Sequence, residues 1–305
     1  MSRSNLPMLR DEGMFSDLGV GVGLRPTHYS DVLSERPVTP WFEAISENYL
    51  GTSVECGGRS LEILDRIRRD HAIVLHGVSL SIGSTDPLNL PYLKRLRGLI
   101  DRVQPAWVSD HICWTGAEGE NLHDLLPLPF TEESLRHLTA RIQRVQDRLG
   151  RRMIFENVSS YLTFKHSEMT EWEFLEELCR RADCGLLLDL NNIYVSSVNQ
   201  GFDPVVYLEA ISPERVGQLH LAGHSKRNGY LLDTHDQPVS PAVWELYRMA
   251  LRRFGAVSTL IEWDASIPKY SVLEAEAVTA RRIRLAELER RVPGESRDLG
   301  HPVPA

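Results

Sequence analysis

The chain has 305 residues, of which 42% are hydrophobic and 25% are charged, the balance of a soluble globular protein. Its formal net charge is −8 and no basic stripe offsets it, which argues against a nucleic-acid-binding protein. No apolar run reaches the roughly 20 residues of a membrane span, and the first residues lack the apolar region of a signal peptide. We therefore expect a cytoplasmic protein that binds neither nucleic acid nor membrane.

Eight short apolar segments are typical of buried parallel strands, and each ends at a histidine or an acidic residue. In chain order these end residues are His28, Glu47, His76, His111, Glu156, Asp189, His220 and Glu262. Between the segments lie stretches with apolar residues at helical spacing, over residues 60–71, 92–104, 131–150, 169–184, 203–212, 240–255 and 272–290.

This alternation predicts the fold. Eight strand–helix units in roughly 270 residues fit an α/β fold of the (β/α)8 TIM-barrel type better than an open sheet. We expect an N-terminal extension over residues 1–18, a single barrel domain over residues 19–290 and a flexible tail over residues 291–305, which is polar and rich in Pro and Gly.

The strand ends predict a metal site. In a barrel the carboxyl ends of all strands meet at one face, so His76, His111 and His220 would lie at one level. Glu156, Asp189 and Glu262 would converge there too, and buried acids cost several kcal/mol unless they are paired or bind a cation. A multivalent cation explains all six residues together. The alternative, ion pairs with barrel arginines such as Arg25, stays open for any single acid.

Other residues extend this set. Asp233 and His235 are two residues apart, so in an extended segment they point the same way. His224 is a candidate ligand, base or supporting residue. Asn191 and Asn192 follow Asp189, and we expect Asn191 to share its side of the strand.

Mixed nitrogen and oxygen ligands suit Fe, Mn or Zn, and the spacing does not choose among these metals. The roles of His28 and Glu47 stay open.

The four cysteines predict no further site. They are Cys56, Cys113, Cys179 and Cys184, and their spacings match neither a disulfide framework nor a zinc framework. We expect reduced and mostly buried thiols, as is usual in the cytosol.

Ten ordered motifs resemble a known family. They include LHGVSLSIGS, VSDHICW, FENVSSYL, GLLLDLNNIYVSSVNQGFDP, QLHLAGH, DTHDQPV and LIEWDASIP. Between Gly19 and Arg290 the chain resembles the multinuclear non-haem iron-dependent oxidative enzymes (MNIO family), which include the iron oxidase of methanobactin biosynthesis. It departs from the family pattern at Ile45, where a histidine is expected, and at Gln200, where NHG is expected.

The resemblance implies a function. It implies two or three irons of mixed Fe(II)/Fe(III) valence, O2 as cosubstrate, and modification of cysteines in a ribosomally made precursor peptide that a small partner protein presents. One iron would bind His76, His111 and Glu156, and a second would bind Glu156, Asp189, His220 and Glu262. A third would take Asp233, His235 and an asparagine, Asn191 before Asn192. We assign catalytic roles to His76, Glu156, Asp189 and His224.

Two other functions remain possible from the sequence. A divalent-metal barrel isomerase or hydrolase without redox chemistry uses the same residue types at its strand ends. A metal-binding or peptide-binding protein without turnover is less favoured, since a binding module need not carry so many convergent acids.

Overall fold

The computed structural model describes residues 15–35, 37–51 and 58–291, and it confirms the expected barrel. In these residues eight parallel strands close into one cylinder, in the order β1-β12-β9-β8-β7-β4-β3-β2. The strands are β1 (Val20–Leu24), β2 (Trp41–Ile45), β3 (Ala72–His76), β4 (Val108–His111), β7 (Ile154–Glu156), β8 (Gly185–Asp189), β9 (Val216–Leu221) and β12 (Ser258–Ile261).

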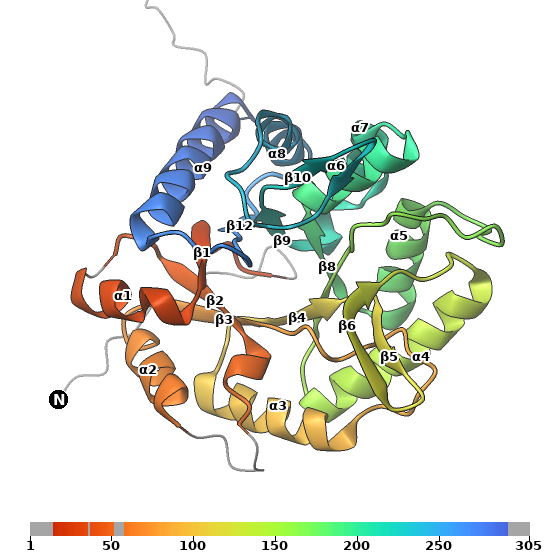
Figure 1. Cartoon of the computed structure of the whole chain (residues 1–305), viewed down its shortest axis with the longest axis horizontal. Helices are drawn as coiled ribbons and strands as arrows, with labels where there is room; N and C mark the ends of the chain where they lie inside the picture. The colour runs from red at the N-terminus through yellow and green to blue at the C-terminus, as the bar shows by residue number, and fades with distance from the viewer. Residues whose placement is uncertain (1–14, 36, 52–57, 292–305) are drawn as a thin grey trace, which may run out of the picture.

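Helices surround the strands as a ring, as Figure 1 shows. They are α1 (Tyr29–Glu35), α2 (Arg59–Ile67), α3 (Leu90–Val103), α4 (Glu132–Leu149), α5 (Glu171–Ala182), α6 (Leu190–Gln200), α7 (Pro204–Ala210), α8 (Pro241–Phe254) and α9 (Tyr270–Arg291). The expected ends of α4 are confirmed. The side chain of Thr131 accepts a hydrogen bond from the amide of Ser134, and Gly150 adopts a positive φ of 63° that a glycine tolerates at a helix end.

The first two strands end earlier than expected. The segment expected to end at His28 leaves β1 at Leu24, because Pro26 starts a short 3-10 helix, Pro26–His28. Glu47 likewise lies in a 3-10 helix, Ser46–Asn48, beyond β2. Neither residue therefore occupies the strand position that its segment suggested.

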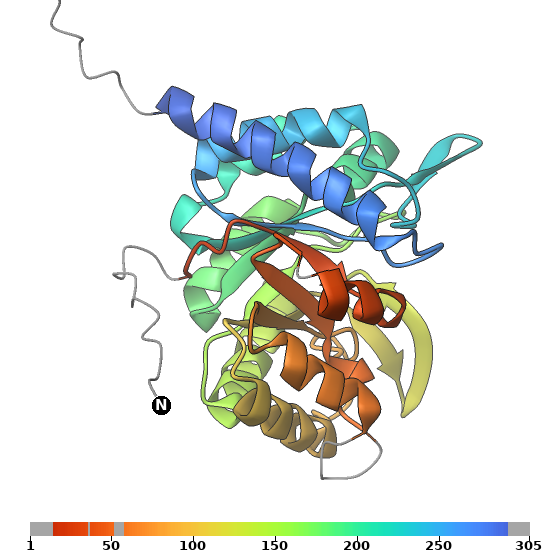
Figure 2. The ribbon, with the colours of Figure 1, turned by 90° about the vertical axis from the view of Figure 1, so that its left-hand side faces the viewer.

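Two segments expected to be loops contain hairpins. One pairs β5 (Trp114–Ala117) with β6 (Glu120–Leu126), and the other pairs β10 (Ser225–Arg227) with β11 (Tyr230–Leu232). Both turns contain a glycine at positive φ, and the second is Asn228-Gly229, a strong hairpin signal in the sequence. Figure 2 shows both hairpins at the same end of the barrel.

The opposite end of the barrel is closed by an apolar plug. Six buried side chains form it: Trp41, Val74, Trp107, Ile154, Leu187 and Leu260. Phe15 and Leu18 pack beneath them, so residues 15–18 of the expected extension lie against the barrel. A Cβ atom at Gly185 would overlap the Phe15 ring, which explains a glycine in the middle of that contact. Residues 1–14 and 292–305, which include most of the expected tail, lie outside the described residues.

The described cysteines behave as expected. Cys113, Cys179 and Cys184 are buried and free, whereas Cys56 lies outside the described residues. None of the described helices combines the length and the apolar character that a membrane crossing requires.

Removal of the Phe15 ring should destabilise the barrel without changing its mouth, the end at which the carboxyl ends of the strands meet. We expect Phe15→Ala to lower the free energy of unfolding by about 3 kcal/mol, the lower end of the range for Phe→Ala because Phe15 is only partly buried. Urea unfolding measures this change, with Leu162→Ala, which truncates a side chain that is 53% exposed, as the control. Equal stability of the two variants would contradict the role of Phe15.

Candidate metal centre

Side chains alternate between the two faces of each strand, and this alternation points the candidate residues into the barrel. Residues two apart on a strand share a face, so the position two residues after a plug residue also faces inward. On five strands that next position carries a histidine or an acid: Trp41 precedes Glu43, Val74 precedes His76, Ile154 precedes Glu156, Leu187 precedes Asp189 and Leu260 precedes Glu262. The two-residue period of the strands therefore stacks a polar layer directly on the apolar plug.

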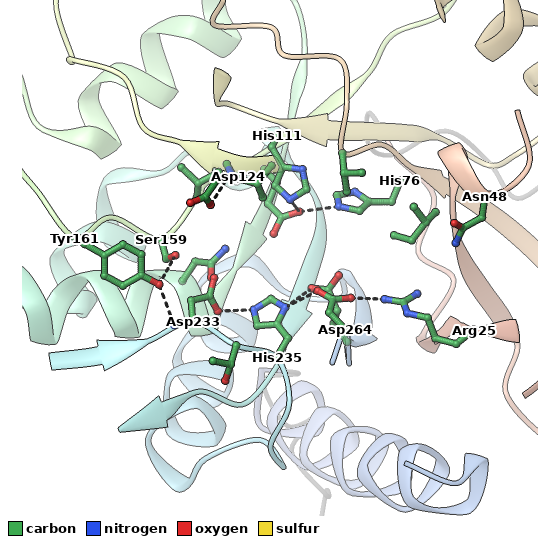
Figure 3. A pocket seen from close by; sticks show the side chains of 18 residues that line it. Arg25, Asn48, His76, His111, Asp124, Ser159, Tyr161, Asp233, His235 and Asp264 are labelled. Carbon is green, nitrogen blue, oxygen red and sulfur yellow. Dashed lines mark hydrogen bonds and ion pairs between the residues drawn. The ribbon is translucent and has the colours of Figure 1, made fainter. Parts of the chain in front are cut away.

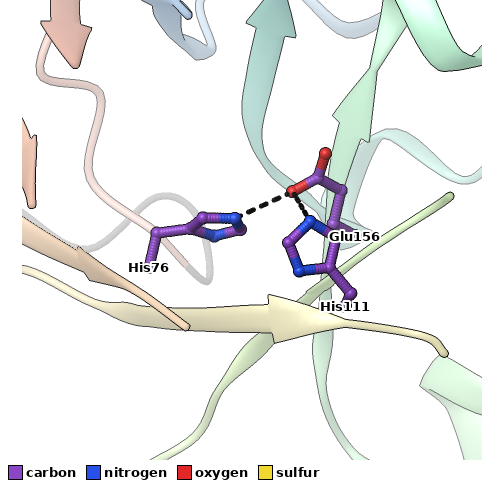
Figure 4. A group of neighbouring side chains, drawn as sticks. All are labelled: His76, His111 and Glu156. Atoms are coloured by element: carbon purple, nitrogen blue, oxygen red, sulfur yellow. Dashed lines mark ion pairs between the residues drawn. The ribbon is translucent and has the colours of Figure 1, made fainter. Parts of the chain in front are cut away.

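The first group joins β3, β4 and β7. Nε2 of His76 and Nε2 of His111 each lie 3.3 Å from Oε2 of Glu156, and all three side chains are buried (Figure 4). The other ring nitrogens face hydrogen-bond acceptors: Nδ1 of His76 is 2.7 Å from Oγ of Ser109, and Nδ1 of His111 is 3.1 Å from the carbonyl of Gly77. A proton held at Nδ1 leaves Nε2 with a free lone pair, the arrangement of a metal-binding histidine.

The second group shares Glu156 with the first and adds β8, β9 and β12. Nδ1 of His220 lies 2.8 Å from Oε2 of Glu262, 3.7 Å from Oε1 of Glu156 and 3.9 Å from Oδ2 of Asp189. His220 and Asp189 are fully buried, and Glu262 is nearly so. Three carboxylates thus surround one nitrogen, close enough for one cation to contact all four side chains.

A third group, centred on His235, lies at the rim of the barrel mouth (Figure 3). Nε2 of His235 is 2.7 Å from Oδ1 of Asp233, and Nδ1 is 3.2 Å from both Glu262 and Asp264. Arg25 donates to Asp264 at 2.5 Å. The expected pairing of Asp233 with His235 is therefore present. Arg25 pairs with a rim acid here rather than with Glu156, Asp189 or Glu262 in the mouth.

The two asparagines lie on a helix, so the expectation that Asn191 shares the side of Asp189 is wrong. Asp189 caps the N-terminus of α6 and accepts from the amide of Asn192 at 2.6 Å. In a helix the residue three positions on shares the face, which favours Asn192. Asn191 instead donates to Asp233 at 2.8 Å, and its Oδ1 lies 2.7 Å from Nδ1 of His224.

The residues whose roles stayed open have partners outside the three groups. Nε2 of the buried His28 lies 2.9 Å from the carbonyl of Pro268. Oε1 of Glu47 accepts from the hydroxyl of Tyr92 at 2.8 Å and from the amide of Val78 at 3.1 Å.

Sequence reasoning missed two acids near the groups. Glu43 is fully buried in the middle of β2, and Asp264 lies two residues beyond Glu262. The sequence contains an indication of each of these acids. An acid within the apolar run WFEAI has few explanations other than a polar partner inside the barrel. Asp264 keeps the two-residue spacing from Glu262.

Burial and crowding set the protonation of the first two groups. Burial, and then the neighbouring His76 ring, lower the pKa of His111 to about 3. Burial raises the pKa of Asp189 to about 7 and that of Glu156 well above its usual value. Burial opposes the charged form of His220, but Glu262 and Glu43 raise its pKa well above the usual value. Without a cation, protons therefore have to screen the carboxylates from each other.

The donor atoms fit a bound cation. Six buried side-chain atoms around the mouth have no hydrogen bond to another described residue besides the close histidine–carboxylate contacts given above: Oε2 of Glu156, Oδ2 of Asp189, Oδ1 of Asn192, Nδ1 of His220, Nε2 of His235 and Oε2 of Glu262. Such atoms are costly unless something else binds them. They lie at or beneath a cavity of about 520 Å³, which Asp124 and Tyr161 border on the outer side (Figure 3).

Comparison with known proteins identifies close relatives. The model of the family described as RiPP precursor modification enzyme MbnB/TglH/ChrH matches residues 19–285. A UPF0276 protein of Anaeromyxobacter sp. (strain Fw109-5) is 56% identical over 271 residues, which cover 89% of this chain and 94% of the relative. A UPF0276 protein of Caulobacter vibrioides (strain NA1000 / CB15N) is 53% identical over 264 residues, 86% of this chain and 93% of the relative.

Solved structures share the fold at low identity. D-psicose 3-epimerase from Clostridium cellulolyticum H10 superposes with a TM-score of 0.60 at 10% identity, over 88% of this chain and 99% of that one. A D-tagatose 3-epimerase-like protein gives 0.56 at 16% identity, over 89% and 97%. These likenesses show the barrel and carry nothing about the substrate.

The raised pKa of Asp189 predicts how the metal-free protein responds to pH. The folded pKa of about 7 exceeds the reference value of 3.8, so the folded state binds the proton more tightly. The stability that this carboxyl contributes is complete below pH 3.8 and is lost as pH rises toward 7. We expect the Tm of the chelator-treated protein to fall between pH 5 and 7, and to fall less in Asp189→Asn. Parallel curves for the two proteins would contradict this assignment.

Proposed function

Because this chain belongs to the MbnB/TglH/ChrH family of RiPP precursor modification enzymes, we propose that it is a multinuclear iron- and O2-dependent oxidase that modifies cysteines of a precursor peptide. One observation supports the metal chemistry above all. Three overlapping groups of histidines and carboxylates converge on one barrel mouth and leave their free donor atoms pointing at each other. Nitrogen and oxygen ligands without thiolate are suited to iron.

Each group would hold one ion. His76, His111 and Glu156 would hold the first, and Asp189, His220 and Glu262, together with Glu156, would hold the second. Bound iron would supply the electron transfer and the activation of O2 that side chains cannot provide. The chain contributes fixed ligand positions on rigid strands and a cavity that admits a substrate side chain.

A third ion would lie at the rim. His235 would bind through Nε2, which faces Asp233 and lies 3.7 Å from Oδ2 of Asp189. Of the two asparagines, Asn192 is the better ligand, because its Oδ1 is buried without a hydrogen-bond partner and the residue borders the cavity. Asn191 already bonds to both Asp233 and His224.

The catalytic roles follow from these positions. His76, Glu156 and Asp189 would hold the ions that face the cavity. His224 would act through Asn191, whose amide donates to Asp233 and so orients that carboxylate toward His235. Burial lowers the pKa of His224, which keeps its ring neutral and able to hold a fixed tautomer near neutral pH.

The proposed substrate is a cysteine-containing precursor peptide, presented by a small partner protein in the cytoplasm. The family is described as modifying RiPP precursors. The cavity is lined by Asp124 and Leu125 of β6 and by Asp233 beyond β11, at the end of the barrel where Figure 2 shows both hairpins. In this proposal the thiol of the peptide is the group that the iron-dependent chemistry modifies.

The decisive experiment is a reconstitution. The chain is loaded with Fe(II) without oxygen, mixed with a cysteine-containing precursor encoded beside its gene, and exposed to O2. We expect O2 consumption and a mass change confined to the peptide cysteines. A protein that ignores O2 and turns over a sugar or a phosphodiester with Mn or Zn would favour the barrel isomerase or hydrolase instead.

Substitutions at three of the proposed ligands should remove iron and activity together. We expect His76→Ala, Glu156→Ala and His220→Ala each to lower the bound iron by at least one ion per chain and to abolish turnover. Iron content after desalting and single-turnover assays measure both effects. The exposed His166→Ala is the control and should retain both. Full activity in any of the three variants would refute its assignment as a ligand.

The asparagine preference has its own test. We expect Asn192→Leu to lower the occupancy of the third ion, because it removes the buried Oδ1. Asn191→Leu should retain that ion while it weakens the position of Asp233. Iron-to-protein ratios at limiting Fe(II) compare the two variants, and the reverse order would restore Asn191 as the ligand.

A further inference from the structure

One buried acid inside the barrel belongs to none of the three groups. Glu43 is the third residue of β2 and is 0% exposed. It lies one inward position beyond the plug residue Trp41, which puts it beneath the mouth. Its Oε2 is 3.1 Å from Nε2 of His220 and accepts from the amide of Gln218 at 2.6 Å.

His220 therefore has acids on both sides of its ring. Nδ1 faces Glu262 and the second ligand group, and Nε2 faces Glu43. A neutral imidazole that binds a cation through Nδ1 must carry its proton on Nε2. That proton needs an acceptor in the barrel interior, which holds few of them.

Gln218 does not serve as that acceptor. Its Oε1 accepts from the indole N–H of Trp107 at 2.5 Å, which turns its amide nitrogen toward both Glu43 and His220. The amide nitrogen is a donor only. The amide nitrogen and Nε2 of His220 lie 2.8 Å apart, and both face the same oxygen, Oε2 of Glu43, at 2.6 Å and 3.1 Å. This oxygen is consequently the acceptor that the two donors share, and the amide of Gln218 also holds the carboxylate in place.

We propose that Glu43 is a positioning residue that fixes the Nε2-protonated form of His220 and so presents Nδ1 to a cation held with Glu156, Asp189 and Glu262. This role rests on the proposed metal centre. The charged acceptor also distinguishes His220 from His76 and His111, whose Nδ1 atoms face a hydroxyl and a carbonyl. A charged acceptor makes the ring a stronger donor to the metal than a neutral acceptor does.

A chain of contacts with the apolar plug holds the Glu43 carboxylate in place. Trp107 packs edge-on against Trp41 in the plug, with the ring centroids 5.8 Å apart. The chain of contacts from Trp107 through Gln218 to Glu43 thus ties the orientation of His220 to the apolar plug. A flexible acceptor would orient the ring less sharply.

The test compares Glu43→Gln and Glu43→Leu for Co(II) binding, without oxygen, by chelator competition and by the visible spectrum of the bound ion. We expect Glu43→Leu to weaken the binding of one ion by about 10–100-fold and to change its spectrum. Glu43→Gln keeps an acceptor oxygen and the side-chain shape, so it should restore most of the affinity. The unfolding temperature of each metal-free variant reports on folding separately.

Glu287→Gln is the matched control. Glu287 is a buried acid of α9 that pairs with Arg248, Arg252 and Arg290, away from the barrel mouth. It should change the unfolding temperature and leave Co(II) binding as it is. If Glu43→Leu binds Co(II) with wild-type affinity and spectrum, the positioning role is wrong and the metal centre stands. If the wild-type chain itself binds no Co(II) or Fe(II), the metal centre fails and the role of Glu43 fails with it.

Discussion

The mouth of this barrel depends on how the repulsion among its buried carboxylates is balanced. Glu43, Glu156, Asp189 and Glu262 are all buried around His220. In the protein alone the balance comes from protons, which keep Glu156 and Asp189 from ionising at their usual pH and keep His220 charged. Multivalent cations achieve the same balance with more charge per site, and they also use the free lone pairs. The arrangement is therefore poor as a structural core and well suited to holding ions.

The barrel tolerates these buried carboxylates because one layer of side chains stabilises the fold and a separate layer carries the acids. The apolar plug and the packing of strands against helices stabilise the fold, and the polar layer above the plug carries the candidate ligands. The residues of the first two groups lie on strands or directly after them, so their backbone positions are fixed by the sheet. Asp233 and His235 lie on the segment after β11, and Arg25 and Asp264 support them from the other side of the rim. The residues of the third group thus lie mainly on loops, whereas those of the first two groups lie at strand ends.

The sequence predicted the parts of this structure that follow from strand period. Strand-end positions such as His76 and Glu156 could be assigned because a parallel barrel delivers strand ends to one face. The helical position of Asn191 and Asn192 was missed, although Asp189 is a favoured helix N-cap residue that could have indicated α6. Glu43 was missed because attention to strand ends overlooks an acid within a strand. Its partner Gln218 is 175 positions away, and only the closed barrel brings the two together.

The closure of the cylinder has a consequence for the timing of assembly. Glu262 follows β12, the last strand, and belongs to both the second and the third group. β12 pairs with β1, the first strand, and Arg25 beyond β1 bonds to Asp264 across the same seam. A growing chain lacks β12 until the other seven strands of the barrel have been made. The second and third groups are therefore complete only once β12 has closed the cylinder, so an ion that needs either whole group would be taken up by the closed barrel rather than by a partial one.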